Sequence, residues 1–175
     1  VADTFTEDFT QDDGAPAGWV VVSPTVLVES GELTLTPGSA AEVDTFAGQG
    51  GDGLWFESVS HIEFDMAYPG ETTSWPFDHG GVIFGAQGIG GRYSTTCYAI
   101  DYIAAAADNS AVGRFRLGRF INGAEAPIIE TAVNITEYEG KWAIDLTETT
   151  ISFSFNGVEQ FTVEDTQVPR TGYVG

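Results

Sequence analysis

Glu63 and Asp65 lie two residues apart in the stretch HIEFDMAY, which runs from His61 to Tyr68. In a β-strand, residues two apart face the same way, so both carboxylates should project from one face of a sheet. Two carboxyl groups about 5 to 5.5 Å apart can act as nucleophile and general acid–base. The spacing therefore makes this strand a candidate for acid–base chemistry.

The stretch also resembles the first half of the Glu-x-Asp-x-x-Glu strand motif of laminarinase-type retaining glycosidases. In that motif the last Glu is the acid–base catalyst, and the resemblance maps it onto Tyr68. A phenol with a pKa of about 10 cannot readily take over that role. We therefore expect Glu63 and Asp65 to occupy two positions of the glycosidase motif without a catalytic role. We predict no catalytic residue. A glycoside hydrolase of the same fold with another acid–base group remains an alternative.

Most of the chain alternates between polar and apolar residues, with interruptions at Gly, Pro, Asp and Asn. This pattern predicts short strands separated by turns. Asn156-Gly157 is a preferred two-residue turn and predicts a hairpin within 149–165. The other strands are predicted at 18–22, 25–30, 32–37, 60–69, 80–87, 96–103, 112–123, 141–148 and 171–175. Their number and spacing predict an all-β, two-sheet antiparallel β-sandwich that forms one domain over 1–175.

The composition is strongly acidic, with 26 Asp and Glu against six Lys and Arg and a formal charge of −20. Nucleic acid is therefore not an expected partner, because phosphate binding needs a basic footprint. No apolar run reaches the roughly 18 residues of a membrane span, so no membrane insertion is expected. Most carboxylates should form a solvated acidic shell. Asp8, Asp12 and Asp13 could gather Ca²⁺ ligands, so calcium is an alternative and no cofactor is required.

Cys97 is the single cysteine, which excludes an internal disulfide. Its place within a predicted strand indicates a small buried residue rather than a nucleophile. The sequence begins with Val rather than Met, which fits removal of a leader segment. We therefore expect an extracellular, secreted protein.

The order of several segments resembles a concanavalin-A-like, or laminin-G-like, jelly roll. The segments that carry the resemblance are VESGELTLTP, SHIEFDMAYP, YAIDY, VGRFRLGRFING and TTISFSFNGVEQFTVEDTQVPRTGYVG. Within this group the chain is most similar to carbohydrate-binding modules that recognise the ends of fructans and other glycans, and to the 3-keto-disaccharide hydrolase domain. The resemblance implies a non-catalytic, lectin-like domain whose partner is a neutral polysaccharide or oligosaccharide.

Such domains usually add one more strand after the Gly-aromatic-Val-Gly segment, whereas this sequence stops at Gly175. The amino-terminal DTFTEDF could fill that place, the chain could be a piece of a longer one, or a neighbouring molecule could supply the strand. The last case predicts an extracellular structural subunit that self-associates through an unpaired edge strand, with Ca²⁺ neutralising its carboxylates.

A polar patch is predicted on the sheet face that alternation places opposite the core. Guanidinium and carboxylate groups offer fixed donor and acceptor pairs for sugar hydroxyls. The loop 69–81 adds an exposed aromatic residue and a histidine, and Tyr93 and Tyr138 are expected near the rim. The predicted ligand-binding residues are Glu63, Asp65, Trp75, His79, Gln87, Asp101, Arg114 and Arg116. They form one patch only if their strands share a sheet, and the two arginines could instead neutralise Glu63, Asp65 or Asp101 across strands.

Overall fold

The computed structural model describes residues 19–21, 26–29, 32–35, 47–49, 56–67, 79–88, 92–103, 113–132 and 139–175. The chain divides into two compact units, Val1–Leu54 with Gly175 and Trp55–Val174. The expectation of one domain over 1–175 stays a prediction.

Two antiparallel strand pairs make up the described part of the first unit. The strand β1 (Trp19–Val21) pairs with β4 (Ala47–Gln49), and β2 (Val26–Glu29) pairs with β3 (Glu32–Leu35). The first three of these strands lie within predicted ranges. The strand β4 was not predicted, because the glycine-rich sequence around it shows little alternation.

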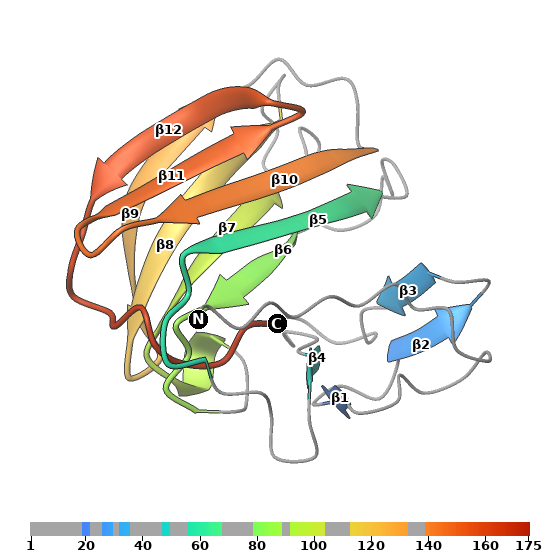
Figure 1. Cartoon of the computed structure of the whole chain (residues 1–175), viewed down its shortest axis with the longest axis horizontal. Helices are drawn as coiled ribbons and strands as arrows, with labels where there is room; N and C mark the ends of the chain where they lie inside the picture. Colours follow the sequence, from blue (N-terminus) through green and yellow to red (C-terminus); the bar gives the residue numbers. More distant parts are fainter. Residues whose placement is uncertain are drawn as a thin grey trace. The chain divides into compact units, whose positions relative to one another are not determined.

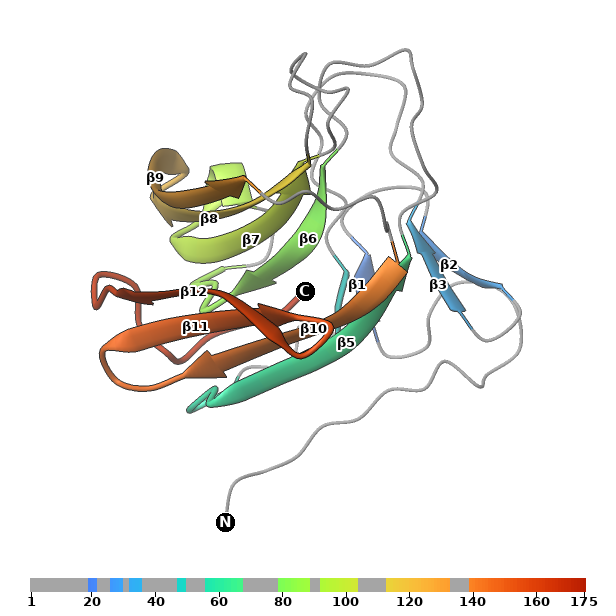
Figure 2. The same cartoon turned by 90° about the horizontal axis from the view of Figure 1, so that it is seen from above.

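The second unit contains two antiparallel sheets of four strands each within its described residues (Figure 1). One sheet has the order β12-β11-β10-β5, and the other has the order β6-β7-β8-β9. The strands are β5 (His61–Ala67), β6 (His79–Phe84), β7 (Cys97–Ile103), β8 (Arg114–Ile121), β9 (Ala124–Ala132), β10 (Glu139–Leu146), β11 (Thr150–Phe155) and β12 (Val158–Glu164). Figure 2 shows the two sheets as separate layers. The predicted all-β, two-sheet antiparallel sandwich is therefore confirmed.

Aromatic rings from both sheets interlock in the core. Phe115 of β8 meets Phe153 of β11 with ring centroids 4.8 Å apart, and meets Trp142 of β10 at 5.2 Å. All three rings are almost fully buried. Burying one such side chain stabilises the fold by about 2 to 3 kcal/mol, so these contacts hold the two layers face to face.

Alternation fixes which face of each strand meets this core. On β5, Ile62, Phe64 and Met66 pack against the core cluster, whereas the intervening polar residues face solvent. On β7 every residue is buried, including those on the face that points away from the core. One of them is Asp101, which is 4% exposed. A carboxylate buried on the outer face of a sheet requires partners there, and these partners define the site described below.

Two Asn-Gly turns connect consecutive strands. Asn156 and Gly157 have φ values of 49° and 74°, which is the left-handed conformation of a tight hairpin turn between β11 and β12. This confirms the predicted hairpin. Asn122 and Gly123 repeat the geometry, at 51° and 80°, between β8 and β9. The second turn brings the carboxylates of β9 beside the arginines of β8.

The carboxy-terminal segment after β12 links both sheets of the second unit. Phe56 and Gly172 exchange backbone hydrogen bonds of 3.0 and 2.9 Å just ahead of β5. Ala86 and Tyr173 exchange bonds of 3.1 and 2.9 Å just after β6. The Gly-Tyr part of the closing segment therefore pairs with residues next to an edge strand of each sheet.

Candidate functional site: an arginine–carboxylate cluster on the β6–β9 sheet

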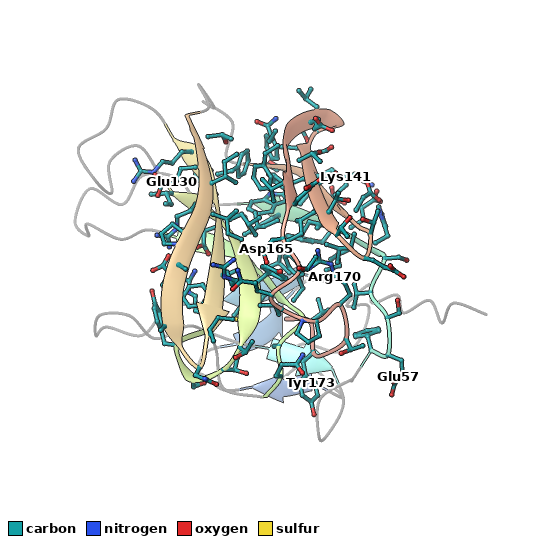
Figure 3. All side chains as sticks on the ribbon, turned by 90° about the vertical axis from the view of Figure 1, so that its left-hand side faces the viewer. Glu57, Glu130, Lys141, Asp165, Arg170 and Tyr173 are labelled. Carbon is teal, nitrogen blue, oxygen red and sulfur yellow. The ribbon has the colours of Figure 1, made fainter. Side chains whose placement is uncertain are left out.

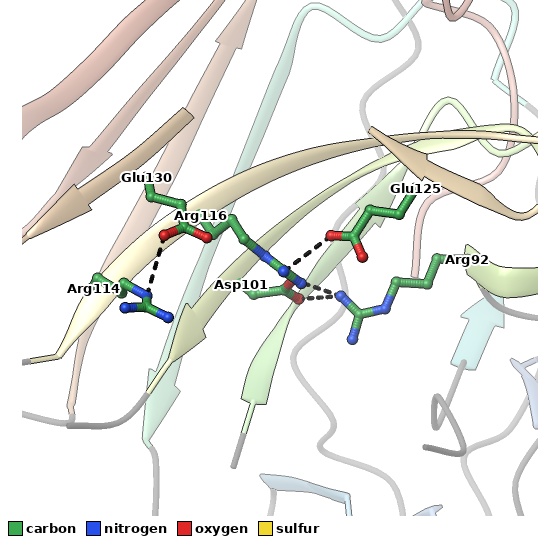
Figure 4. Close-up of polar contacts among 6 residues, drawn as sticks. All are labelled: Arg92, Asp101, Arg114, Arg116, Glu125 and Glu130. Carbon is green, nitrogen blue, oxygen red and sulfur yellow. Dashed lines mark hydrogen bonds and ion pairs between the residues drawn. The ribbon is translucent and has the colours of Figure 1, made fainter. Parts of the chain in front are cut away.

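Six charged side chains gather on the outer face of the β6–β9 sheet (Figure 4). They come from the 3-10 helix η1 (Arg92–Ser94) and from β7, β8 and β9. We call this set the arginine–carboxylate cluster; its members are Arg92, Asp101, Arg114, Arg116, Glu125 and Glu130. Strand register brings them together, because Arg116 lies opposite Asp101 on one side and opposite Glu130 on the other.

Asp101 forms the buried base of the cluster. The Nη1 atom of Arg92 lies 2.6 Å from its Oδ1 and 2.5 Å from its Oδ2. The Nη2 atom of Arg116 lies 3.3 Å from its Oδ2. The two guanidinium groups compensate the charge that burial would otherwise penalise.

Arg116 extends the cluster from Asp101 toward β9. Its Nη1 atom lies 3.0 Å from Oε1 of Glu125, while its Nη2 atom contacts Asp101. Arg114, two residues earlier on the same face, has its Nε 3.5 Å from Oε2 of Glu130. Arg92, Asp101, Arg116 and Glu125 thus form a chain of alternating basic and acidic groups, and the Arg114–Glu130 pair lies beside it on the same face.

The charged side chains of the cluster differ in exposure. The side chains of Asp101, Arg92 and Arg116 are 6%, 12% and 15% exposed. Those of Glu125, Arg114 and Glu130 are 25%, 27% and 43% exposed. The cluster therefore has a fixed, mostly buried base and an open rim, and the rim offers donor and acceptor atoms to a molecule from solvent.

Aromatic rings border the cluster at its Arg92 end. The guanidinium carbon of Arg92 lies 5.4 Å from the ring centroid of Tyr93 and 5.7 Å from that of Phe120. Phe120 is fully buried, whereas Tyr93 is 47% exposed. These distances are in the range of cation–π contacts, which help to hold the guanidinium in place.

Three of the predicted ligand-binding residues, Asp101, Arg114 and Arg116, are brought together in this cluster. The alternative prediction, that the arginines neutralise Glu63, Asp65 or Asp101 across strands, is confirmed for Arg116, which pairs with Asp101. Arg114 pairs with Glu130 instead. Ion pairing does not exclude a binding role, because the rim atoms stay accessible. The role of these residues in ligand binding stays a prediction.

Glu63 and Asp65 do not join the cluster, because the condition for a single patch, that all these strands share one sheet, is not met. They lie on the outer face of β5, which belongs to the β12-β11-β10-β5 sheet, whereas the cluster lies on the other sheet. Outer faces of two packed sheets point in opposite directions, so the two sets of side chains are on opposite sides of the sandwich. Alternation showed the face of each strand but not which sheet the strand joins.

The carboxylate of Glu63 pairs with Lys141 on the neighbouring strand. The Nζ atom of Lys141 lies 2.8 Å from Oε1 of Glu63. This hydrogen bond and the lysine charge lower the pKa of Glu63, and the pKa of Lys141 is raised in return by the same contact. His61 has its Nδ1 2.7 Å from Oδ1 of Asp145 on the same exposed face. A carboxyl group with a lowered pKa is a poor proton donor near neutral pH.

Gln87 anchors the backbone of the closing segment. Its Nε2 atom donates to the carbonyl oxygens of Gly85 and Thr171, at 3.0 and 2.8 Å. Its predicted role in ligand binding stays a prediction. His79 begins β6, opposite Ile103 in the strand register. The remaining predicted positions, Tyr68, Trp75, Tyr138 and the calcium candidates Asp8, Asp12 and Asp13, lie outside the described residues.

Arg92, Glu125 and Glu130 belong to the cluster but are not among the residues predicted from the sequence. Glu125 and Glu130 could have been found, because the Asn122-Gly123 turn folds β9 back onto β8 and sets their register against Phe120 and Arg116. Arg92 carried no such signal, because it lies in a short 3-10 helix with no alternating pattern around it.

A second buried polar group, distinct from the cluster, ties the end of β12 to the core side of the β6–β9 sheet. The hydroxyl of Tyr98 donates to Oδ1 of Asp165 at 2.5 Å and accepts from the backbone N–H of Val168 at 3.2 Å. Arg119 forms an ion pair with the same carboxylate, and the guanidinium of Arg170 lies 5.1 Å from the Tyr98 ring. Figure 3 shows Asp165 and Arg170 between the two sheets.

Burial and hydrogen bonding act in opposite directions on the Asp165 carboxyl. Burial raises its pKa, but the hydrogen bonds from Tyr98 and from the Gln167 backbone, together with the Arg119 charge, outweigh burial and leave the pKa below its ordinary value. For Tyr98, burial raises the pKa and the bond to Asp165 raises it further. Both groups therefore keep their ordinary neutral-pH charge state, and this polar group is a structural clasp.

Two further observations concern the described residues alone. They contain no group of three or more His, Cys, Asp or Glu side chains arranged to hold a metal ion. None of their helices is long and apolar enough to cross a membrane. Cys97 is buried and unbonded to another cysteine, as the sequence predicted.

No family model matches the sequence, and no curated protein matches it. Among solved structures, the chain is similar to the carbohydrate-binding module CBM66 from Bacillus subtilis. The two superpose with a TM-score of 0.61 over 90% of this chain and 87% of that module, at 13% sequence identity. At this identity the similarity shows a shared β-sandwich fold, and the function has to be argued from the site.

Proposed function

We propose that this protein is a non-catalytic carbohydrate-binding domain that recognises a neutral polysaccharide or oligosaccharide through the arginine–carboxylate cluster. The observation that carries the proposal is the cluster itself, on a fold shared with a carbohydrate-binding module. The proposal includes an extracellular location and a place among the concanavalin-A-like, laminin-G-like jelly rolls.

The chemistry of the cluster suits sugar hydroxyls. Each hydroxyl both donates and accepts, so adjacent hydroxyls are bound best where donors and acceptors alternate at fixed positions. Arg116 supplies N–H donors between the carboxylates of Asp101 and Glu125, and Glu130 adds exposed acceptors at the rim. Charge-assisted hydrogen bonds of this type contribute about 1.5 to 3 kcal/mol each.

Charge favours a neutral ligand over an acidic one. The cluster combines three arginines with three carboxylates, so its formal charges cancel. The whole chain has a formal charge of −20, which repels anionic polysaccharides at low ionic strength. A neutral glycan is not repelled by the charge of the chain.

The cost of the buried ion pairs supports a functional reading of the cluster. Replacing a buried ion pair by well-packed apolar residues is often neutral or stabilising, so stability alone does not require Arg92, Asp101 and Arg116 on this face. Binding does require them, because apolar side chains cannot orient hydroxyls.

Electrophoresis through gels that contain single polysaccharides tests the proposal directly. The panel comprises four neutral polysaccharides (a fructan, a β-glucan, a xylan and a galactomannan) and one anionic polysaccharide, polygalacturonate. We expect retardation by at least one neutral polysaccharide, no retardation by the anionic one, and no release of reducing sugar. Equal migration in every gel would contradict the proposed function, and release of sugar would favour the hydrolase alternative.

A further inference from the structure

We infer that Tyr93 is the aromatic wall of the glycan site, against which the apolar C–H face of a sugar ring stacks beside the arginine–carboxylate cluster. The inference rests on the proposed function and extends it from hydroxyl recognition to recognition of a ring face. Nothing in the cluster itself provides an apolar surface, and sugar rings present both hydroxyls and C–H groups to a binding site.

Tyr93 is an exposed aromatic residue beside the cluster. Among the described residues, it is the single aromatic side chain classed with the exposed large hydrophobic residues, at 47% exposure. It directly follows Arg92, whose guanidinium carbon lies 5.4 Å from its ring centroid and whose Nη1 contacts Asp101. The exposed ring therefore contacts Arg92, which in turn contacts Asp101 at the buried base of the cluster.

The ring is held in a fixed orientation. It meets the buried ring of Phe120 in an edge-to-face contact, with centroids 5.5 Å apart and an angle of 89° between the ring planes. On another side it contacts the Arg92 guanidinium. An aromatic side chain that is already ordered loses little rotamer entropy when a ligand stacks on it, so it contributes more to affinity than a mobile one.

The backbone of η1 is fixed as well. The N–H of Gly123 donates to the Thr95 carbonyl at 2.8 Å, and the N–H of Asn122 donates to Thr96 Oγ1 at 2.9 Å. Gly123 approaches the Tyr93 carbonyl so closely that a Cβ atom there would lie 2.1 Å from its oxygen. The β8–β9 turn thus clamps the segment that carries Tyr93 against the sheet of the cluster.

Tyr93→Ala tests the inference, with Tyr93→Phe and Tyr93→Leu as paired variants. Affinities come from electrophoresis in the neutral polysaccharide gels described above, with thermal unfolding as a check of folding. Tyr93→Ala should weaken binding roughly tenfold, and Tyr93→Leu should weaken it too because it lacks a flat ring. Tyr93→Phe keeps the ring and should bind within about twofold of wild type.

Ile121→Ala is the matched control. Ile121 is 36% exposed at the end of the same strand as Phe120, and alternation places it on the opposite face from Phe120. Its loss should leave glycan affinity unchanged. The inference is overturned if folded Tyr93→Ala binds like wild type, or if Tyr93→Phe loses as much as Tyr93→Ala. Should wild type bind none of the neutral polysaccharides, the proposed function fails and the inference with it.

Discussion

Asp101 on β7 and Arg116 on β8 are direct cross-strand neighbours, with Arg116 Nη2 3.3 Å from Asp101 Oδ2. Arg116 also contacts Glu125, and Asp101 also contacts Arg92, so this pair is the centre of the cluster. Strand register alone brings these two residues together. The architecture of the sheet therefore creates the centre of the proposed sugar-binding site.

Replacing Asp101 by Asn should destabilise the protein. The substitution keeps the shape of the side chain but leaves the guanidinium groups of Arg92 and Arg116 without their buried counter-charge. Removing one partner of a buried ion pair typically costs about 3 kcal/mol. Urea unfolding at pH 7 measures the loss. An unchanged free energy of unfolding would mean that Asp101 is already solvated, contrary to its 4% exposure.

The two Asn-Gly turns should respond differently to alanine. Gly157 has φ +74° and nothing within 4 Å of a new Cβ, so Gly157→Ala should cost about 1 kcal/mol for the left-handed conformation alone. Gly123 has φ +80° and would place its Cβ 2.1 Å from the Tyr93 carbonyl oxygen, so Gly123→Ala should cost about 3 kcal/mol.

Thermal and urea unfolding of both glycine variants measure this difference. Because the collision at position 123 displaces the backbone of Tyr93, Gly123→Ala should also weaken glycan binding, whereas Gly157→Ala should not. Equal unfolding free energies for the two variants would show that η1 does not press on the β8–β9 turn.

Acid should destabilise the protein through Asp165. Its pKa in the folded state lies below the ordinary Asp value of about 3.9, so its contribution to stability is complete above that pH. The contribution is lost as the pH falls below about 3.9 and through the lowered folded value, because the unfolded chain binds the proton first.

Asp165→Asn should therefore be less stable than wild type at pH 7, and should lose less stability on acidification. Unfolding midpoints in urea between pH 7 and pH 2 measure both effects. The Tyr98 hydroxyl affects stability at high pH instead. Because its pKa is raised in the folded state, its contribution to stability is lost only as the pH rises above about 10. If wild type and Asp165→Asn lost stability equally on acidification, the contacts of Asp165 with Tyr98 and Arg119 would not be acid-sensitive.

Self-association through an edge strand stays a prediction, and two features of the described edge strands act against it. The strand β9 carries Pro127 at a register shift, with Glu125 and Glu130 nearby. The strand β12 exposes Glu159 and Glu164 and pairs across a register shift of its own. Bulges, proline and charge are common means of preventing edge-to-edge pairing, so these two edges are poor templates for a donated strand.

The fold could be predicted because its signals are local. Alternation on 60–69 placed Phe64 inward and Glu63 outward, and the Asn156-Gly157 turn set the β11–β12 hairpin. The candidate site was predicted only in part because its assembly is not local. Which sheet a strand joins depends on contacts between distant segments, and this put Glu63 and Asp101 on different sheets.

Arg116 is the residue whose loss tests the central claim most directly. Isothermal titration calorimetry would compare wild type, Arg116→Gln and Glu63→Gln with the neutral polysaccharide that retards wild type most strongly. Glu63→Gln is the matched control, since it also removes one partner of a cross-strand ion pair, on the other sheet. We predict that Arg116→Gln lowers affinity by about 10- to 100-fold while Glu63→Gln binds like wild type. Wild-type affinity in folded Arg116→Gln, or loss of binding in Glu63→Gln, would contradict the assignment of the site to the arginine–carboxylate cluster.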